Sequence, residues 1–142
     1  MLNRSRSRQE RGQEVVEFAI LLPVLIWMLF GMLDFGRVYF SAITITNAAR
    51  VGARYGIIYP DDTGGITAAA QAEAQGSGVD LTDATVSTIE LSCPDSLTPT
   101  ALPCDSGTPV RVTITYRFSL ILTAFLAEPE IEIVRSAEMM VP

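Results

Sequence analysis

The stretch that decides the fold is RGQEVVEFAILLPVLIWMLFGMLDFGR, residues 11–37. Sixteen residues without a charge run from Phe18 to Leu33. As a helix they cover about 24 Å of a hydrocarbon layer that is about 30 Å thick, so flanking apolar residues are needed to complete a span. Pro23 removes one backbone N–H near the start of the run, and we expect a kink or local melting there.

Three interpretations of this segment compete. A core helix of a soluble protein needs a cover, and nothing else in the chain is large enough to provide one. A cleavable secretory signal fits the basic start, but no A-x-A site follows, and Asp34 and Arg37 lie where cleavage is expected. A retained single span fits best. We therefore predict a basic leader at 1–12, a transmembrane helix at 13–36 and a head domain at 37–142.

Charge is distributed in a way that predicts the orientation. Residues 1–12 hold four arginines and one glutamate, a net charge of +3, whereas residues 57–142 hold three arginines and twelve acids, a net charge of −9. Basic flanks stay in the cytoplasm, so the head is expected outside the cytoplasmic (inner) membrane. An acidic head repels phosphates, which argues against nucleic-acid binding.

The chain has no histidine and no lysine. This removes histidine-based zinc sites, Ser-His and Cys-His nucleophile pairs, and Schiff-base chemistry. The acids form no recognisable catalytic pair, and YPDDTGG at 59–65 lacks the alternating acids and closing glutamate of a calcium loop. We therefore assign no catalytic residue, no metal and no cofactor, and expect a protein that is not an enzyme.

Two cysteines, Cys93 and Cys104, bracket the stretch CPDSLTPTALPC. Their spacing is too wide for a CxxC redox motif, and two thiolates alone make a poor metal site. Two unrelated buried cysteines are the alternative to a bridge. Because both lie in the part expected outside the cytoplasm, where disulfides persist, a disulfide is favoured. It stabilises by roughly 3 kcal/mol in the chain-entropy model.

Beyond the apolar run the helical period continues. Polar residues recur in steps of three and four from Arg37 to Arg54, and an apolar face follows Val38, Ala42, Ile45, Ala49 and Ala53. This predicts one long helix over about 14–56, with a stop at Gly56. We expect a loop at 59–65 and a short helix at 67–76.

Further along the chain, apolar residues recur at every second position, as in a β-strand. Alternation predicts strands at 85–91, at 110–118 and at 130–141, with Arg135 interrupting an apolar face and therefore expected near an edge. Residues 120–127 fit a strand, a short helix or a loop. The predicted fold is α+β: a pilin-like long N-terminal helix, transmembrane and then amphipathic, packed on a small antiparallel sheet of three or four strands.

Glu17 stands directly before the apolar run, where an unpaired carboxylate is costly. The segment GQEVVEF at 12–18, with a short basic leader before it, resembles the class III signal of type IV pilins. Together with NAARVGARYG at 47–56, VRVTITYRF and VRSAEMM, it resembles TadE-like pseudopilins of tight-adherence (Tad/Flp) pilus systems. The specific likeness lies at 12–18 and 47–54.

This resemblance implies that a prepilin peptidase cuts between Gly12 and Gln13. The freed amine of Gln13 is then a cation that can pair with Glu17, either within the helix or between subunits, which sets the register of assembly. Small residues at Ala48, Ala49, Gly52 and Ala53 are expected to allow close packing of helices or of the sheet.

The implied function is that of a pseudopilin or minor pilin that primes or joins a filament used for attachment. Its partners are then other pilins or copies of itself, the peptidase, an inner-membrane assembly platform and membrane lipid. Two alternatives remain open: a major, self-polymerising filament subunit, and a simple membrane-tethered binding domain in which Glu17 only reaches the headgroups.

Overall fold

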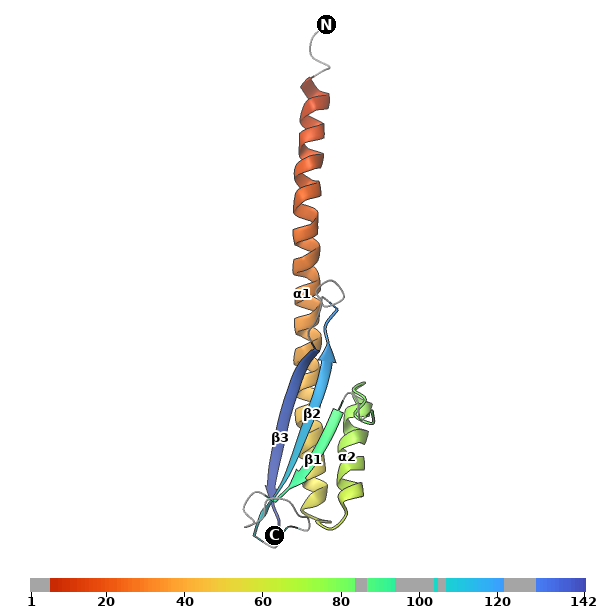
Figure 1. Ribbon diagram of the computed structural model, residues 1–142, viewed down its shortest axis with the longest axis vertical. Coiled ribbons are helices and arrows are strands. Elements are labelled where there is room, and N and C mark those ends of the chain that lie inside the picture. Colours follow the sequence, from red (N-terminus) through yellow and green to blue (C-terminus); the bar gives the residue numbers. More distant parts are fainter. Residues whose placement is uncertain (1–5, 84–86, 94–103, 105–106, 122–129) are drawn as a thin grey trace.

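The computed structural model describes residues 6–83, 87–93, 104, 107–121 and 130–142. Its elements are α1 (Arg6–Gly56), α2 (Thr63–Gly76), β1 (Ser87–Ser92), β2 (Pro109–Ser119) and β3 (Glu130–Met140). Figure 1 shows α1 as a long rod with the other elements gathered along its C-terminal half. This confirms the predicted α+β class with three antiparallel strands. Residues 1–5, the start of the strand predicted at 85–91, and 122–127 lie outside the described residues.

The long helix α1 begins at Arg6, earlier than the predicted start near residue 14, and it ends at Gly56 as predicted. The leader residues from Arg6 to Arg11 are arginine, glutamine, glutamate and serine, which include several good helix formers, so a helix that is stable further along extends back through them. A kink or local melting was expected at Pro23, and the helix does not melt there, because α1 is continuous through it.

The sheet has the order β1-β2-β3, and both pairs are antiparallel. Alternate residues of β2 face inward, and Val110, Val112 and Ile114 are fully buried. The α1 residues Ile45, Ala49 and Ala53 are buried with them in one core. The predicted packing of the sheet on the outer half of the helix is therefore confirmed.

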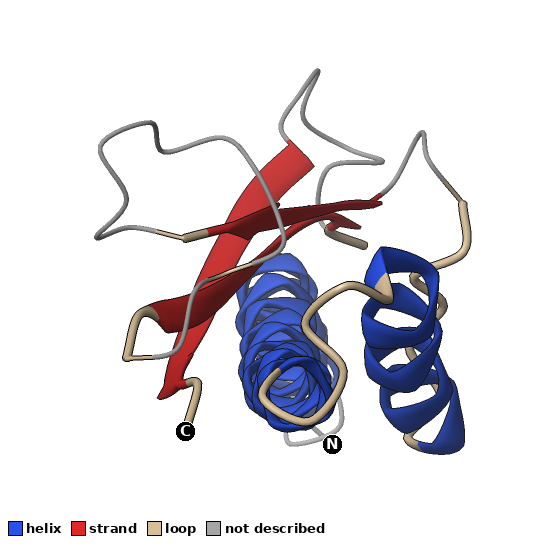
Figure 2. Cartoon of the chain, turned by 90° about the horizontal axis from the view of Figure 1, so that it is seen from below, coloured by secondary structure: helices blue, strands red, loops and turns tan. Residues whose placement is uncertain are grey.

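The second helix lies along another side of α1. Figure 2, which looks along α1, shows the sheet on one side of this helix and α2 beside it. Ile66, Ala70 and Ala74 are buried against α1. The chain reverses direction between the two helices, since a Cβ on Gly56 would lie near Ile66 and a Cβ on Gly52 would lie near Ala70.

The predicted loop at 59–65 was too long, because α2 begins at Thr63 rather than near residue 67. The side chain of Asp62 accepts a hydrogen bond from the backbone N–H of Gly65 at 2.8 Å and so caps the helix. An aspartate at this position satisfies one of the unpaired N–H groups of the first turn. The cap offsets the poor helix propensity of Gly64 and Gly65 in the first turn of α2.

Candidate assembly surface

The N-terminal half of α1 is an exposed apolar rod, which we call the stalk (residues 13–36). Every side chain from Gln13 to Leu29 is exposed, and Phe18, Trp27 and Phe35 have exposed fractions of 59, 50 and 73%. Soluble monomers rarely expose an apolar patch of this size. Within the described residues α1 is, by its length and composition, long and apolar enough to cross a membrane.

Glu17 lies exposed on α1, at the start of this rod. Among the described residues its carboxylate has neither an ion pair nor a hydrogen-bond partner. Gln13 lies one helical turn earlier, and the Gly12–Gln13 bond lies within α1. A carboxylate in this setting can take a cation from a neighbouring molecule or from a new N-terminus, and is costly in lipid without one.

The four small residues expected to aid packing lie inside the head. Ala48, Ala49 and Ala53 have no exposed surface, and Gly52 is also buried. A Cβ built on Gly52 would lie 3.2 Å from the Cβ of Ala70. The small side chains therefore let α2 and the sheet approach α1 within one chain, and they are not on the surface that a neighbouring subunit could touch.

A contact that the sequence did not reveal joins the stalk to the head. Asp34 is buried, and its carboxylate accepts the backbone N–H of Ile121 at 3.0 Å. It also pairs with Arg37 at 3.3 Å, as its spacing of three residues on a helix suggests. The guanidinium of Arg37 lies 4.9 Å from the ring centre of Phe118 on β2. These contacts fix the end of β2 to the helix where the apolar rod ends.

The two cysteines form a disulfide, with their Cα atoms 5.6 Å apart. Cys93 follows β1 and Cys104 precedes β2, and both are buried. The bridge thus closes the connection between two paired strands. Because disulfides persist in oxidising compartments, it fits a head outside the cytoplasm.

At the far end of α1 a second set of polar contacts holds α2. The hydroxyl of Tyr55 donates a hydrogen bond to Asp62 at 3.0 Å, and this bond raises the pKa of Tyr55 above its ordinary value of 10.0. Asp62 thus joins the two helices as well as capping α2. In the part of the chain that the structure describes, His, Cys, Asp and Glu do not gather in threes as a metal site requires.

Comparison with known families gives one match. The family model of the TadE-like protein matches residues 12–54. This range contains the stalk and the small-residue segment, and it confirms the resemblance inferred from residues 12–18 and 47–54. No curated protein and no solved structure matches the chain. The match makes residues 12–54 TadE-like, and residues 55–142, which include most of the head, lie outside the matched range.

Proposed function

We propose that this chain, TadE-like over residues 12–54, is a pseudopilin or minor pilin that primes or joins a tight-adherence pilus. The observation that carries the proposal is the exposed apolar stalk with the unpartnered carboxylate of Glu17 at its start. A membrane anchor needs only the apolar surface. A subunit that must pack beside others in lipid also needs a device that sets the stagger between them.

The proposed topology follows from charge and composition. Residues 1–12 are a basic leader in the cytoplasm, residues 13–36 cross the membrane, and residues 37–142 form the head outside. The disulfide between Cys93 and Cys104 supports this direction, since cytosolic thiols are kept reduced. The head then presents its sheet and α2 on the face of the membrane from which a pilus grows.

Cleavage between Gly12 and Gln13 by a prepilin peptidase is the next step of the proposal. It removes the leader arginines and frees an amine on Gln13, about one helical turn from Glu17. In an assembly, the amine of one subunit can pair with Glu17 of its neighbour. An ion pair of this kind adds little net stability but strongly disfavours a wrong register, because a misplaced charge is left unpaired in lipid.

Two other functions remain alternatives. A major filament subunit would use the same stalk, and regular fibres made from this protein alone would favour it. A tethered binding domain would use the stalk only as an anchor. The carboxylate of Glu17 argues against the second, because an anchor needs no charge at the start of its span.

Mass spectrometry of the protein purified from its native host tests the proposal. We expect the mature chain to begin at Gln13, and to begin at Met1 when the prepilin peptidase is deleted. We also expect deletion of the gene to lower the number of pili and the attachment of cells, with recovery on re-expression. Protein that enters pili with its leader intact, or normal pili in the deletion strain, would falsify this function.

A further inference from the structure

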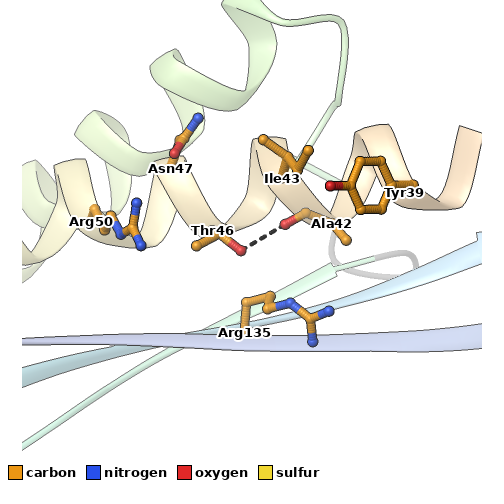
Figure 3. Close-up of a pocket in the computed structure, with 7 residues that line it drawn as sticks. All are labelled: Tyr39, Ala42, Ile43, Thr46, Asn47, Arg50 and Arg135. Atoms are coloured by element: carbon orange, nitrogen blue, oxygen red, sulfur yellow. Dashed lines mark hydrogen bonds between the residues drawn. The ribbon is translucent and has the colours of Figure 1, made fainter.

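A groove lies between α1 and the edge strand β3, outside the features described so far. It has a volume of about 300 Å³ and is lined by Tyr39, Ala42, Ile43, Thr46, Asn47, Arg50 and Arg135. Figure 3 shows Arg135 rising from β3 toward α1, below Ala42 and Thr46. Ala42 and Thr46 face β3, and Tyr39 and Arg50 lie toward the two ends of the groove.

The two arginines of the groove have no acidic partner among the described residues. Arg135 is exposed and donates only to the carbonyl of its neighbour Val134, at 2.8 Å, and Arg50 is also exposed. The register places Arg135 opposite Ile114, on the face of the sheet that packs on α1. A charge on the inward face of an edge strand discourages unwanted strand pairing, but that function does not require the second arginine across the groove.

The position of Arg50 excludes lipid phosphates as its partner. Arg50 lies 17 residues beyond Leu33, which is about 25 Å along a helix. The headgroup region extends only about 5 to 8 Å beyond the hydrocarbon on each side. Lipid phosphates are therefore too distant for Arg50. The surplus of acids lies instead in the chain itself, whose residues 57–142 carry a net charge of −9.

Glu73 on α2 is an acid at a height from which it can reach the groove of another copy. It is exposed and has no ion pair among the described residues. Its helix lies on the other side of α1 from β3 (Figures 1 and 2). Because α2 runs antiparallel to α1, with Ala70 beside Gly52, Glu73 stands at about the level of Ala49. This is within about 5 Å, along the helix axis, of Thr46 in the groove.

We propose that the α1–β3 groove receives Glu73 of a second copy of this chain. The inference rests on the membrane orientation in the proposed function, because two stalks that cross one membrane in parallel hold their heads at one height. The groove and Glu73 lie at that shared height on opposite sides of the head. The contact is therefore heterologous, the type that continues from one subunit to the next. The exposed residues Ala68 and Ala72 of α2 allow the neighbour to approach closely.

Disulfide trapping in membranes tests this contact. Two full-length copies with different tags are co-expressed, one carrying Ile43→Cys in the groove and the other Ala72→Cys on α2. Mild oxidation should join them, and a matched pair of Ile43→Cys with Thr88→Cys, on the outer face of the sheet, should give only background. The native cysteines do not compete, because both are buried in their own bridge.

Charge reversal then assigns the partner. We expect the yield of the disulfide-linked pair to fall about tenfold when Arg135→Glu is introduced into both copies, and likewise for Glu73→Arg. Each change places like charges together. Both changes combined should restore it. Arg54→Glu is the control, since Arg54 is exposed on α1 outside the groove, and it should change the yield by less than about twofold. The proposal is overturned if the linked pair forms no more than in the Ile43→Cys with Thr88→Cys control, or if the charge reversals do not change its yield.

The same strains distinguish a failure of this contact from a failure of the proposed function. The trapping is done in cells that lack the other pilus genes, so that it does not require a pilus. Protease added from outside reports where the head lies. A head that is outside but shows no trapped pair rejects the groove contact alone. A head on the cytoplasmic side rejects the proposed topology, and the contact with it.

Discussion

The carboxylate of Asp34 accepts a hydrogen bond from the backbone N–H of Ile121, a residue 87 positions later in the chain, at 3.0 Å. Asp34 lies on α1 directly after the apolar run, and Ile121 lies just beyond the end of β2. The bond therefore joins the stalk to the sheet where the apolar run ends. It fixes the direction in which the sheet leaves α1.

Replacement of Asp34 by alanine should weaken this junction. It leaves the N–H of Ile121 without its acceptor, a change that costs about 1–3 kcal/mol when the site is buried. Hydrogen exchange of the Ile121 amide in the full-length chain should rise, and the unfolding temperature should fall. Arg37→Gln keeps the Ile121 bond but removes the half-exposed ion pair and the contact of Arg37 with the Phe118 ring, together worth about 0.5–1.5 kcal/mol, and serves as the control. Equal effects of the two changes would contradict the importance given to the Ile121 bond.

The cap of α2 predicts opposite effects at two adjacent glycines. A Cβ on Gly65 would collide with the Asp62 carboxylate and lie 2.6 Å from the Tyr55 hydroxyl, whereas one on Gly64 meets only Asp62 Oδ1 at 3.7 Å. Gly65→Ala should therefore disrupt the cap and destabilise by about 0.5–2 kcal/mol. Gly64→Ala should be neutral or stabilise by up to about 1 kcal/mol through helix propensity. Thermal unfolding of both variants measures the difference.

The pKa of Tyr55 provides a second measurement of this cap. Because the pKa is raised in the folded protein, the contribution to stability is present below the ordinary pKa of 10.0 and is lost as the pH rises through the higher folded value. Ultraviolet titration should place Tyr55 above its ordinary pKa in the wild type and return it toward that value in Gly65→Ala. An unchanged titration curve would show that Asp62 keeps its position despite the added methyl group.

The contact of α1 with α2 predicts that Gly52 tolerates no larger side chain. Its Cβ would lie 3.2 Å from Ala70 Cβ and 3.4 Å from the carbonyl oxygen of Ile66, so Gly52→Leu should cost about 1–3 kcal/mol through overpacking. Gly36→Leu is the matched control, because nothing lies within 4 Å of a Cβ there. Both changes gain the same helix propensity, so the difference between their unfolding free energies isolates the packing at Gly52.

Removal of the disulfide should lower the stability of the head. Its two cysteines are 11 residues apart, and closure of such a loop stabilises by roughly 3 kcal/mol in the chain-entropy model. Cys93→Ala combined with Cys104→Ala should shift the urea midpoint to a lower concentration. A reductant should shift the wild type in the same direction and leave the double variant unchanged. A wild type that unfolds identically with and without reductant would refute the stabilising role.

Periodicity explains why much of this fold was readable from the sequence. The helical repeat through Val38, Ile45 and Ala53 and the alternation of β2 each report one buried face, and the structure buries those faces against each other. Arg135 interrupted such a face and correctly indicated an edge strand. These periodic patterns are local in sequence. They are strong because a buried face needs an apolar residue at every turn of a helix or at every second residue of a strand.

Contacts between distant segments left no comparable signal. Ser41 and Thr44 belong to the polar stripe of α1 and yet are buried, because elements pack around this helix on more than one side. The partnership of Asp34 with Ile121 depends on where β2 ends, which no spacing reveals. The groove likewise brings together residues that lie far apart in sequence, Arg50 and Arg135. Such features follow from the fold and could be found only once it was known.

Glu17 carries the last prediction, which separates a pilus subunit from a plain anchor. Glu17→Gln removes the charge with little change of shape, so membrane insertion and expression should be retained, while pili and attachment should fall several-fold because the register pair is lost. Glu14→Gln is the control: Glu14 is also an exposed carboxylate on α1, but it lies three residues further from the apolar run than Glu17. Counting pili by electron microscopy at matched protein levels measures the effect. Normal numbers of pili in Glu17→Gln would mean that the carboxylate only reaches the headgroups, and the tethered-domain function would then be the better one.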